Sequence, residues 1–205
     1  MALTATEDFT GSDGTQVNSL ADWDGAASGD QSNGLDIYSN SAAPDHANVS
    51  HSNWWTSDSF DNDQYAQGTI VVAGSGMFVG PGVRCSGTDY GSNQNGYHWM
   101  GDSGSTSYLE KYQGGSWTAI DNGSGFSASD EVYMEVEGTS IECKINDVSD
   151  ISATDSSISS GAAGICGYGD GTGTRLDNWE GGNLGEAPSA VPIPVAMRHY
   201  RNMRT

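Results

Sequence analysis

The chain has 205 residues with only 35% hydrophobic content, 29 glycines and a formal net charge of −20. Seven Lys and Arg against 27 Asp and Glu exclude a nucleic-acid-binding body, because phosphate contacts need cationic side chains. The same charge disfavours an acidic membrane surface, and no run approaches the ~18 apolar residues of a membrane span.

The polar residues are mainly Gly, Ser, Thr, Asn and Asp, which form turns, so many short strands are expected rather than long helices. No segment shows a sustained helical period. The pattern predicts roughly ten to thirteen strands, packed as an antiparallel two-sheet β-sandwich or jelly roll. The clearest segments are 34–38, a strand around Val49, 66–73, 76–85, 96–101, 106–112, 116–121, 131–137, 140–145, 161–168 and 174–180.

Two hairpins stand out. Residues 131–137 (EVYMEVE) alternate between apolar and polar, Gly138 supplies a turn that needs a positive φ, and 140–145 (SIECKI) alternate again. A Gly-containing turn joins 106–112 to 116–121 as a second hairpin. The Gly80-Pro81-Gly82 sequence predicts a bulge or bend near a sheet edge.

The segment 130–180 resembles the C-terminal half of concanavalin A-like lectin/glucanase domains, the laminin-G-like jelly rolls. The resemblance rests on the strands 132–138 and 141–146, the "DSSI..GAAGI" stretch 155–165, and the closing "LDNWEG" 176–181. It extends over most of residues 6–182 and implies a lectin-like domain at 1–185. Because these motifs are structural, they specify fold better than function.

Catalysis on this fold uses acidic residues on one strand face. The nearest run holds Glu131, Glu135 and Glu137, but the middle Asp is absent, so a solvated outer face is the preferred interpretation and no enzyme is expected. The resemblance allows one structural Ca²⁺ at a sandwich edge, with oxygen-rich loops at 58–63, 121–125 and 170–174, and no other cofactor is expected. Cys85, Cys143 and Cys166 are expected to be buried hydrophobes, with one disulfide left as an alternative.

Aromatic residues beside polar ones are candidates for glycan contact, since apolar sugar faces stack on rings. Two groups qualify: Trp54 with Trp55, and Tyr97 with Trp99. Adjacent residues of a strand point to opposite faces, so packing in the core is the alternative for at least one residue of each group.

The C-terminal segment 186–205 differs from the rest of the chain. Residues 189–205 carry three Arg and no acidic residue, whereas residues 1–188 hold the other four basic residues and all 27 acidic ones, a balance of −23. Cations and apolar side chains together favour a partner-docking tail. The residues expected to dock are Pro192, Ile193, Pro194, Val195, Met197, Arg198, Tyr200, Arg201 and Arg204.

An acidic β domain with such a tail is similar to small structural proteins of tailed phages. The hypothesis is therefore a non-enzymatic virion protein, a capsid decoration or tail adhesin. Its partners would be other virion proteins or sister subunits in a homo-oligomer, and its loops would touch host-surface glycans. The N-terminus shows no secretory signal, so synthesis in the host cytoplasm and a place in the virion are expected. A free carbohydrate-binding lectin and, less favoured, a glycanase are the alternatives.

Overall fold

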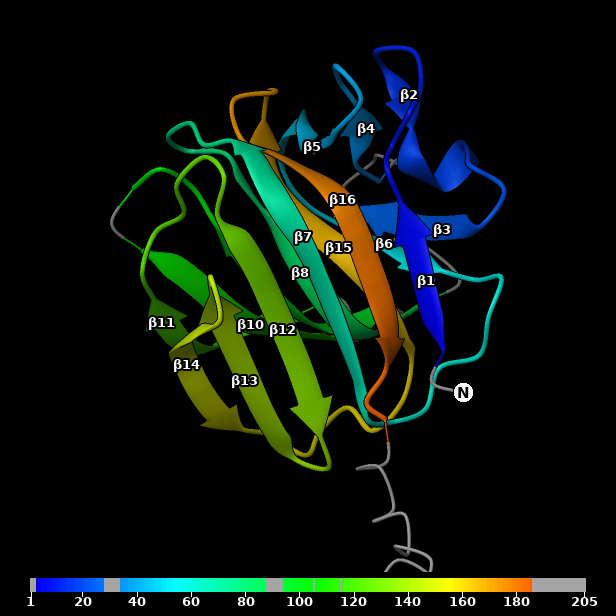
Figure 1. Ribbon diagram of the computed structural model, residues 1–205, viewed down its shortest axis with the longest axis vertical. Helices are drawn as coiled ribbons and strands as arrows, with labels where there is room; N and C mark the ends of the chain where they lie inside the picture. Colours follow the sequence, from blue (N-terminus) through cyan, green and yellow to red (C-terminus); the bar gives the residue numbers. More distant parts are fainter. Residues whose placement is uncertain (1–2, 28–33, 88–93, 105, 115, 186–205) are drawn as a thin grey trace, which may run out of the picture.

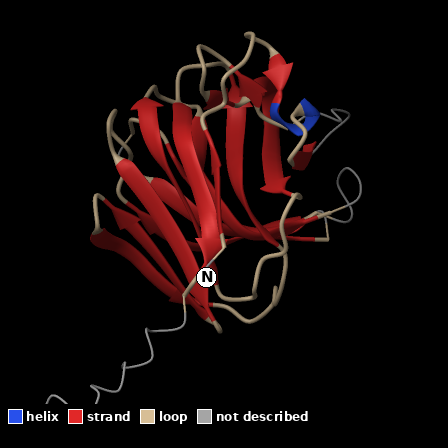
Figure 2. Cartoon of the chain, turned by 45° about the vertical axis from the view of Figure 1, so that its right-hand side comes forward, coloured by secondary structure: helices blue, strands red, loops and turns tan. Residues whose placement is uncertain are grey.

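Two antiparallel β-sheets face each other across a shared apolar core in the computed structural model (Figures 1 and 2). The structure describes residues 3–27, 34–87, 94–104, 106–114 and 116–185. Within these ranges the helical element is a single 3₁₀ turn, η1 (Val17–Ser19), and no helix has the length and apolarity to cross a membrane. The predicted antiparallel two-sheet sandwich is therefore confirmed.

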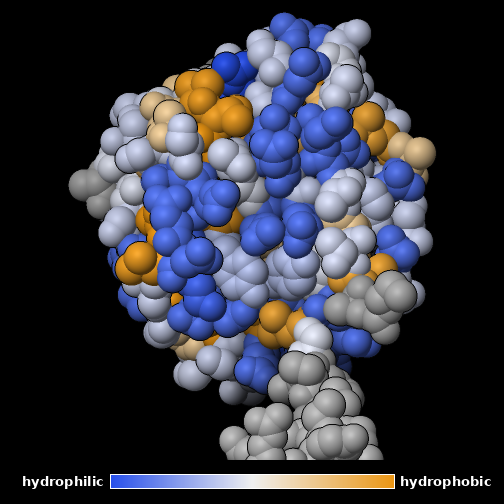
Figure 3. All heavy atoms as spheres, in the orientation of Figure 1, coloured by the Kyte–Doolittle hydropathy of each residue, from blue (hydrophilic) through white to orange (hydrophobic). Residues whose placement is uncertain are grey.

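The nine-stranded sheet runs in the order β14-β13-β12-β7-β16-β5-β4-β2, with β1 pairing along β16. Its strands are β1 (Thr4–Glu7), β2 (Thr15–Gln16), β4 (Asp36–Ile37), β5 (Ala42–Ala43), β7 (Gln64–Val72), β12 (Glu131–Glu137), β13 (Ser140–Ile145), β14 (Val148–Thr154) and β16 (Arg175–Asn183). Figure 3 views this sheet from outside, and hydrophilic residues cover most of that face.

The seven-stranded sheet has the order β11-β10-β9-β8-β15-β6-β3. Its strands are β3 (Trp23–Ala27), β6 (Asp45–Trp55), β8 (Phe78–Ser86), β9 (Asn95–Gly101), β10 (Ser107–Gln113), β11 (Ser116–Gly123) and β15 (Ala162–Asp170). Both predicted hairpins are confirmed, since β12 pairs with β13 and β10 pairs with β11. Gly138 has the expected positive φ, at 58°.

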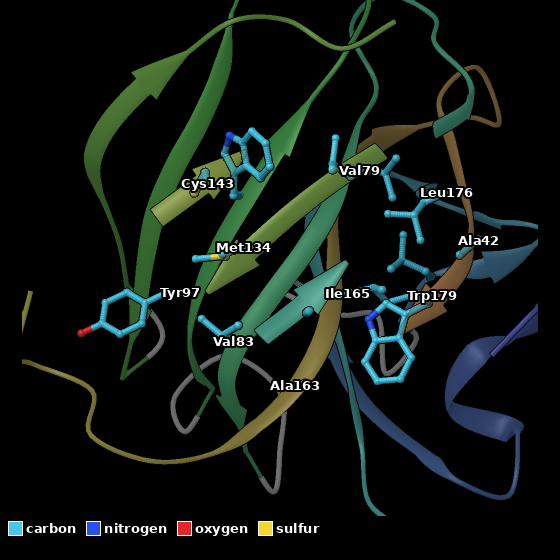
Figure 4. Packing of buried hydrophobic residues seen from close by; sticks show 14 of the residues in the cluster. Ala42, Val79, Val83, Tyr97, Met134, Cys143, Ala163, Ile165, Leu176 and Trp179 are labelled. Carbon is cyan, nitrogen blue, oxygen red and sulfur yellow. The ribbon is translucent and has the colours of Figure 1, made fainter. Parts of the chain in front are cut away.

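Alternation along the strands builds the core. On β12, Val132, Met134 and Val136 are fully buried, and the residues between them lie on the outer face. They meet inward residues of the other sheet, among them Val79, Val83, Tyr97 and Ile165 (Figure 4). An aromatic cluster fills one end of the core, where the rings of Trp23 and Trp179 lie 4.6 Å apart.

The prediction that the Gly80-Pro81-Gly82 sequence lies near a sheet edge is wrong. These residues lie in β8, which pairs with β9 on one side and β15 on the other. Glycine is needed there because a Cβ on Gly80 would lie 2.0 Å from the carbonyl oxygen of Trp99 on β9. The irregularity in the β8–β9 pairing comes later, between Val83 and Ser86, where Arg84 has a φ of 52°. The expected bend near an edge is thus a close strand contact followed by a bulge inside the sheet.

Candidate functional site

The outer face of the seven-stranded sheet carries aromatic side chains. On β10, Leu109 is buried in the core, so Tyr108 and Glu110 on either side of it point outward. Met100 on β9 pairs with Tyr108 and also faces outward, because its neighbour Trp99 lies in the core. Trp117 on β11 pairs with Tyr112 of β10 and extends this outer face to the edge of the sheet.

These residues line a pocket of about 310 Å³, which lies in the size range of small-molecule sites. Five interstrand steps of about 4.8 Å, roughly 24 Å, separate β11 from β6, so the lining draws on six strands. The span of the six lining strands is wider than a single sugar ring. The lining residues are Ser50, Phe78, Met100, Tyr108, Glu110, Trp117 and Tyr168.

The aromatic rings support one another in tilted and edge-on contacts. The ring of Phe78 lies 5.6 Å from that of Tyr108 at an angle of 70°, and 6.4 Å from that of Tyr168 at 48°. Trp117 is 62% exposed and Tyr108 is 36% exposed, and both are among the most exposed large apolar side chains of the described residues. Fixed, solvent-accessible ring faces suit stacking against the apolar face of a sugar.

Glu110 is the carboxylate of the pocket lining. Partial burial raises its pKa above the ordinary value of a glutamate. Its chain neighbour Lys111 points to the opposite side of the strand, where the ammonium contacts Asp155 at 2.9 Å and Ser157 at 2.7 Å. In this pocket the Glu110 carboxylate can accept hydrogen bonds from hydroxyl or ammonium groups of a ligand, and the ring faces around it can attract an ammonium group.

The structure buries the four predicted glycan-contact residues. Tyr97 and Trp99 are completely buried, and Trp55 packs at 5.7 Å against Trp179 within the core. Trp54 is 6% exposed and lies in a separate small cluster with Cys85 and Ala162. The expectation of glycan contact is therefore corrected, since none of these rings offers an open face, and the packing alternative applies.

The three glutamates tested as catalytic candidates lie on β12, on the outer face of the nine-stranded sheet and away from the aromatic pocket. Glu135 accepts hydrogen bonds from Tyr133 at 2.5 Å and Lys144 at 3.3 Å, which hold its pKa below the usual value despite burial. Glu131 and Glu137 are exposed. Glycoside hydrolysis needs two carboxyl groups flanking one bond, whereas the described pocket lining presents Glu110 alone.

The acidic loops use their carboxylates as hydrogen-bond acceptors. In the 58–63 loop, Asp58 accepts from the Trp55 indole at 2.9 Å, and Asp63 accepts from the backbone N–H of Gly138 at 2.7 Å. Asp121 likewise accepts from the backbone N–H of Asn122. Across the described part of the chain, no group of three or more His, Cys, Asp or Glu residues is arranged to hold a metal ion.

All three cysteines are free and buried, as the first interpretation of them predicted, and burial raises the pKa of each thiol. The predicted docking tail lies outside the described residues. Its members are Pro192, Ile193, Pro194, Val195, Met197, Arg198, Tyr200, Arg201 and Arg204.

Several solved structures superpose on this domain over most of its length. A β-glucanase of Bacillus licheniformis superposes with a TM-score of 0.57 and 11% identity, over 89% of this chain and 98% of that one. The carbohydrate-binding module CBM66 of Bacillus subtilis gives 0.51 and 16%, over 88% and 91%. A legume lectin-like domain of Entamoeba histolytica gives 0.50 and 14%, over 84% and 97%.

The fold is that of the concanavalin A-like jelly rolls. At these identities the likeness shows the fold alone. No protein-family model matches the sequence, and no curated protein matches it either. These structures confirm the concanavalin A-like fold that the sequence resemblance implied.

Sequence reasoning missed the pocket residues Phe78, Tyr108, Trp117 and Tyr168. A signal was present, because each belongs to a segment predicted as a strand or lies at its end. Tyr108, for example, alternates with the apolar Leu109 and is therefore assigned to the outer face. What the sequence could not supply is the strand order, which brings β11, β10, β9, β8, β15 and β6 side by side.

Proposed function

We propose that this domain binds glycans, without cleaving them, in the aromatic pocket on the outer face of its seven-stranded sheet. The observation that carries the proposal is the exposed pair Trp117 and Tyr108 on adjacent strands, beside a pocket of about 310 Å³. Trp117 is 62% exposed and lines the pocket together with three further aromatic rings, and exposed apolar side chains grouped in this way mark interaction sites. The lectin-like fold supports the same conclusion by analogy.

Binding without cleavage is supported by the composition of the pocket. A glycosidase holds one carboxyl group as acid and a second as nucleophile or base. The described lining contains Glu110, and the glutamates Glu131, Glu135 and Glu137 lie on β12 in the other sheet. The chemistry that remains is stacking on the rings and hydrogen bonding of hydroxyl groups to Glu110, Ser50 and the tyrosine hydroxyls.

The test is a glycan array probed with the full chain, followed by calorimetry on the strongest ligand. Trp117→Ala and Tyr108→Ala should each weaken binding at least about tenfold, equal to about 1.4 kcal/mol. Val148→Ala is the matched control, because Val148 is 69% exposed on β14 in the other sheet. Unchanged affinity in both pocket variants, with unchanged melting temperatures, would refute the proposed site.

The proposal also places the lectin-like domain on a phage particle, as a decoration protein or tail adhesin anchored by residues 186–205. Support comes from the sequence: the acidic body and the cationic, apolar tail differ sharply in charge. In that setting the pocket would contact host-surface glycans, and the tail would dock on capsid or tail proteins or on sister subunits.

Deleting residues 187–205 separates the two roles. Incorporation into particles should be lost while the deleted protein keeps its glycan affinity. Incorporation at the level of the full chain would refute anchoring by the tail and leave the pocket untouched. Capsid or tail genes beside the coding sequence would add independent support for the virion role.

A further inference from the structure

Glu110 lacks a partner within the described part of the protein. Its carboxylate is half buried on β10, opposite His98 on β9 and Ala119 on β11, and no described residue donates a hydrogen bond to it. A partly desolvated anion without a compensating donor is unfavourable in the empty pocket. A ligand that brings a donor, above all a cationic one, recovers that cost on binding.

The described Lys and Arg side chains all pair with groups other than Glu110. Lys111 is held by Asp155, and Lys144 by Glu135 and Glu142 at 3.3 Å each. Arg84 donates to three backbone carbonyls in the interior, and Arg175 donates to the carbonyl of Tyr38 at 3.1 Å. These four are all the Lys and Arg residues of positions 1–188. His98, opposite Glu110, is buried, which lowers its pKa to about 4 and leaves it neutral at about pH 6. The cation that would balance Glu110 therefore comes from outside these groups.

The rings around Glu110 favour the same ligand chemistry. Phe78, Tyr108, Tyr168 and Trp117 line the pocket together with Met100. Ring faces attract an ammonium group through their quadrupole, and an aromatic cage beside a carboxylate is a general arrangement for organic cations. An acidic sugar, by contrast, meets a carboxylate in the pocket and a net charge of −20 around it.

We infer that the pocket prefers glycans with free amino groups, in which the ammonium of an amino sugar pairs with Glu110 while the sugar ring stacks on Trp117 or Tyr108. The inference rests on the proposed glycan-binding function and names its substrate class. It predicts discrimination against N-acetylated sugars, whose amide carries no charge, and against sugars with carboxylate or sulfate groups.

The test compares two probes of equal length, a β-1,4-linked glucosamine tetramer and its fully N-acetylated counterpart. Calorimetry uses the full chain at about pH 6 and physiological ionic strength, where surface attraction over longer distances is screened. The free-amine tetramer should bind at least about tenfold more tightly. Glu110→Gln should erase that preference, so that the variant binds the two tetramers with affinities within about twofold of each other.

Glu131→Gln is the matched control, because it removes one negative charge from an exposed site on the other sheet. It should leave the preference intact, which separates pairing at Glu110 from general attraction to an acidic protein. Equal binding of the two tetramers, or a preference that survives Glu110→Gln, overturns the inference and leaves the proposed function standing. If no glycan on the array binds, the proposed function fails, and the inference fails with it.

Discussion

The guanidinium of Arg84 on β8 donates a 2.8 Å hydrogen bond to the carbonyl oxygen of Gly138, in the β12–β13 turn of the opposite sheet. The same side chain donates to Ile158 at 2.8 Å and to Asn62 at 2.9 Å, and it is 2% exposed. One buried cation therefore ties the seven-stranded sheet to the turn, and to two loops, at one end of the sandwich. The bulge at Arg84 makes this possible, because Val83 and Arg84 both reach the interior.

Removing this cation should destabilise the fold. Arg84→Met removes three charge-assisted hydrogen bonds, one of them fully buried at Ile158, and should lower the free energy of unfolding by about 3 kcal/mol. Arg175→Met is a graded control, because Arg175 donates one hydrogen bond, to Tyr38. Urea titrations of both variants measure the difference. Equal losses in the two variants would contradict the role assigned to Arg84.

The close approach at Gly80 should be intolerant of any side chain. A Cβ there would lie 2.0 Å from the Trp99 carbonyl oxygen, so Gly80→Ala forces β8 and β9 apart. The expected loss is about 3 kcal/mol, at the upper end for overpacking. Gly185→Ala, where nothing lies within 4 Å, should be neutral. Thermal melts compare the two variants, and a stable Gly80→Ala protein would show that the strands can separate freely.

Buried His98 should make the protein sensitive to mild acid. Burial lowers its pKa from 6.5 to about 4, so the unfolded imidazole takes up a proton before the folded one. Above pH 6.5 the imidazole is neutral in both states and does not reduce the free energy of unfolding. As the pH falls from 6.5 toward 4, protonation of the unfolded state lowers the free energy of unfolding by up to about 3 kcal/mol. His98→Gln should flatten this part of the stability profile. Stability profiles for the two proteins that stay parallel from pH 7 to 4 would refute it.

Glu110 should destabilise the empty protein at neutral pH. Its pKa is raised in the fold, so the protonated form is favoured there, and stability falls as the pH rises through the folded pKa. Glu110→Gln should therefore raise the melting temperature at pH 7 and have little effect near pH 3. Glu131→Gln, at an exposed position, should change neither value. A lower melting temperature for Glu110→Gln at pH 7 would mean that the carboxylate stabilises the fold.

Strand alternation made most of the fold predictable. In segment 131–145 the alternation of apolar and polar residues predicts which side chains are buried and which are exposed. The paired strands β12 and β13 follow that pattern. The two-residue strands β2, β4 and β5 carry too little pattern to be found. Likewise, nothing local indicates that Arg84 adopts a left-handed backbone, because three distant carbonyls hold its side chain.

The candidate site was less accessible to sequence reasoning. The aromatic pair Trp54-Trp55 suggested ligand contact, yet both rings are buried, Trp55 in the core between the sheets and Trp54 in a separate small cluster. The pocket takes one or two residues from each of six strands, as with Phe78 and Tyr168, which lie 90 positions apart. Only the strand order brings such residues together.

The most direct test of the central claim is a ¹H–¹⁵N NMR titration of the full chain with the tightest-binding oligosaccharide, observing the tryptophan indole signals. The Trp117 signal, assigned through Trp117→Phe, should shift as oligosaccharide is added and reach a plateau when the site is saturated. Those of Trp99 and Trp179, whose indoles are bound at 2.9 Å to Ser107 and Gly164, should stay in place. A stationary Trp117 signal, with shifts gathered on β7 and β12 instead, would contradict glycan binding in the aromatic pocket.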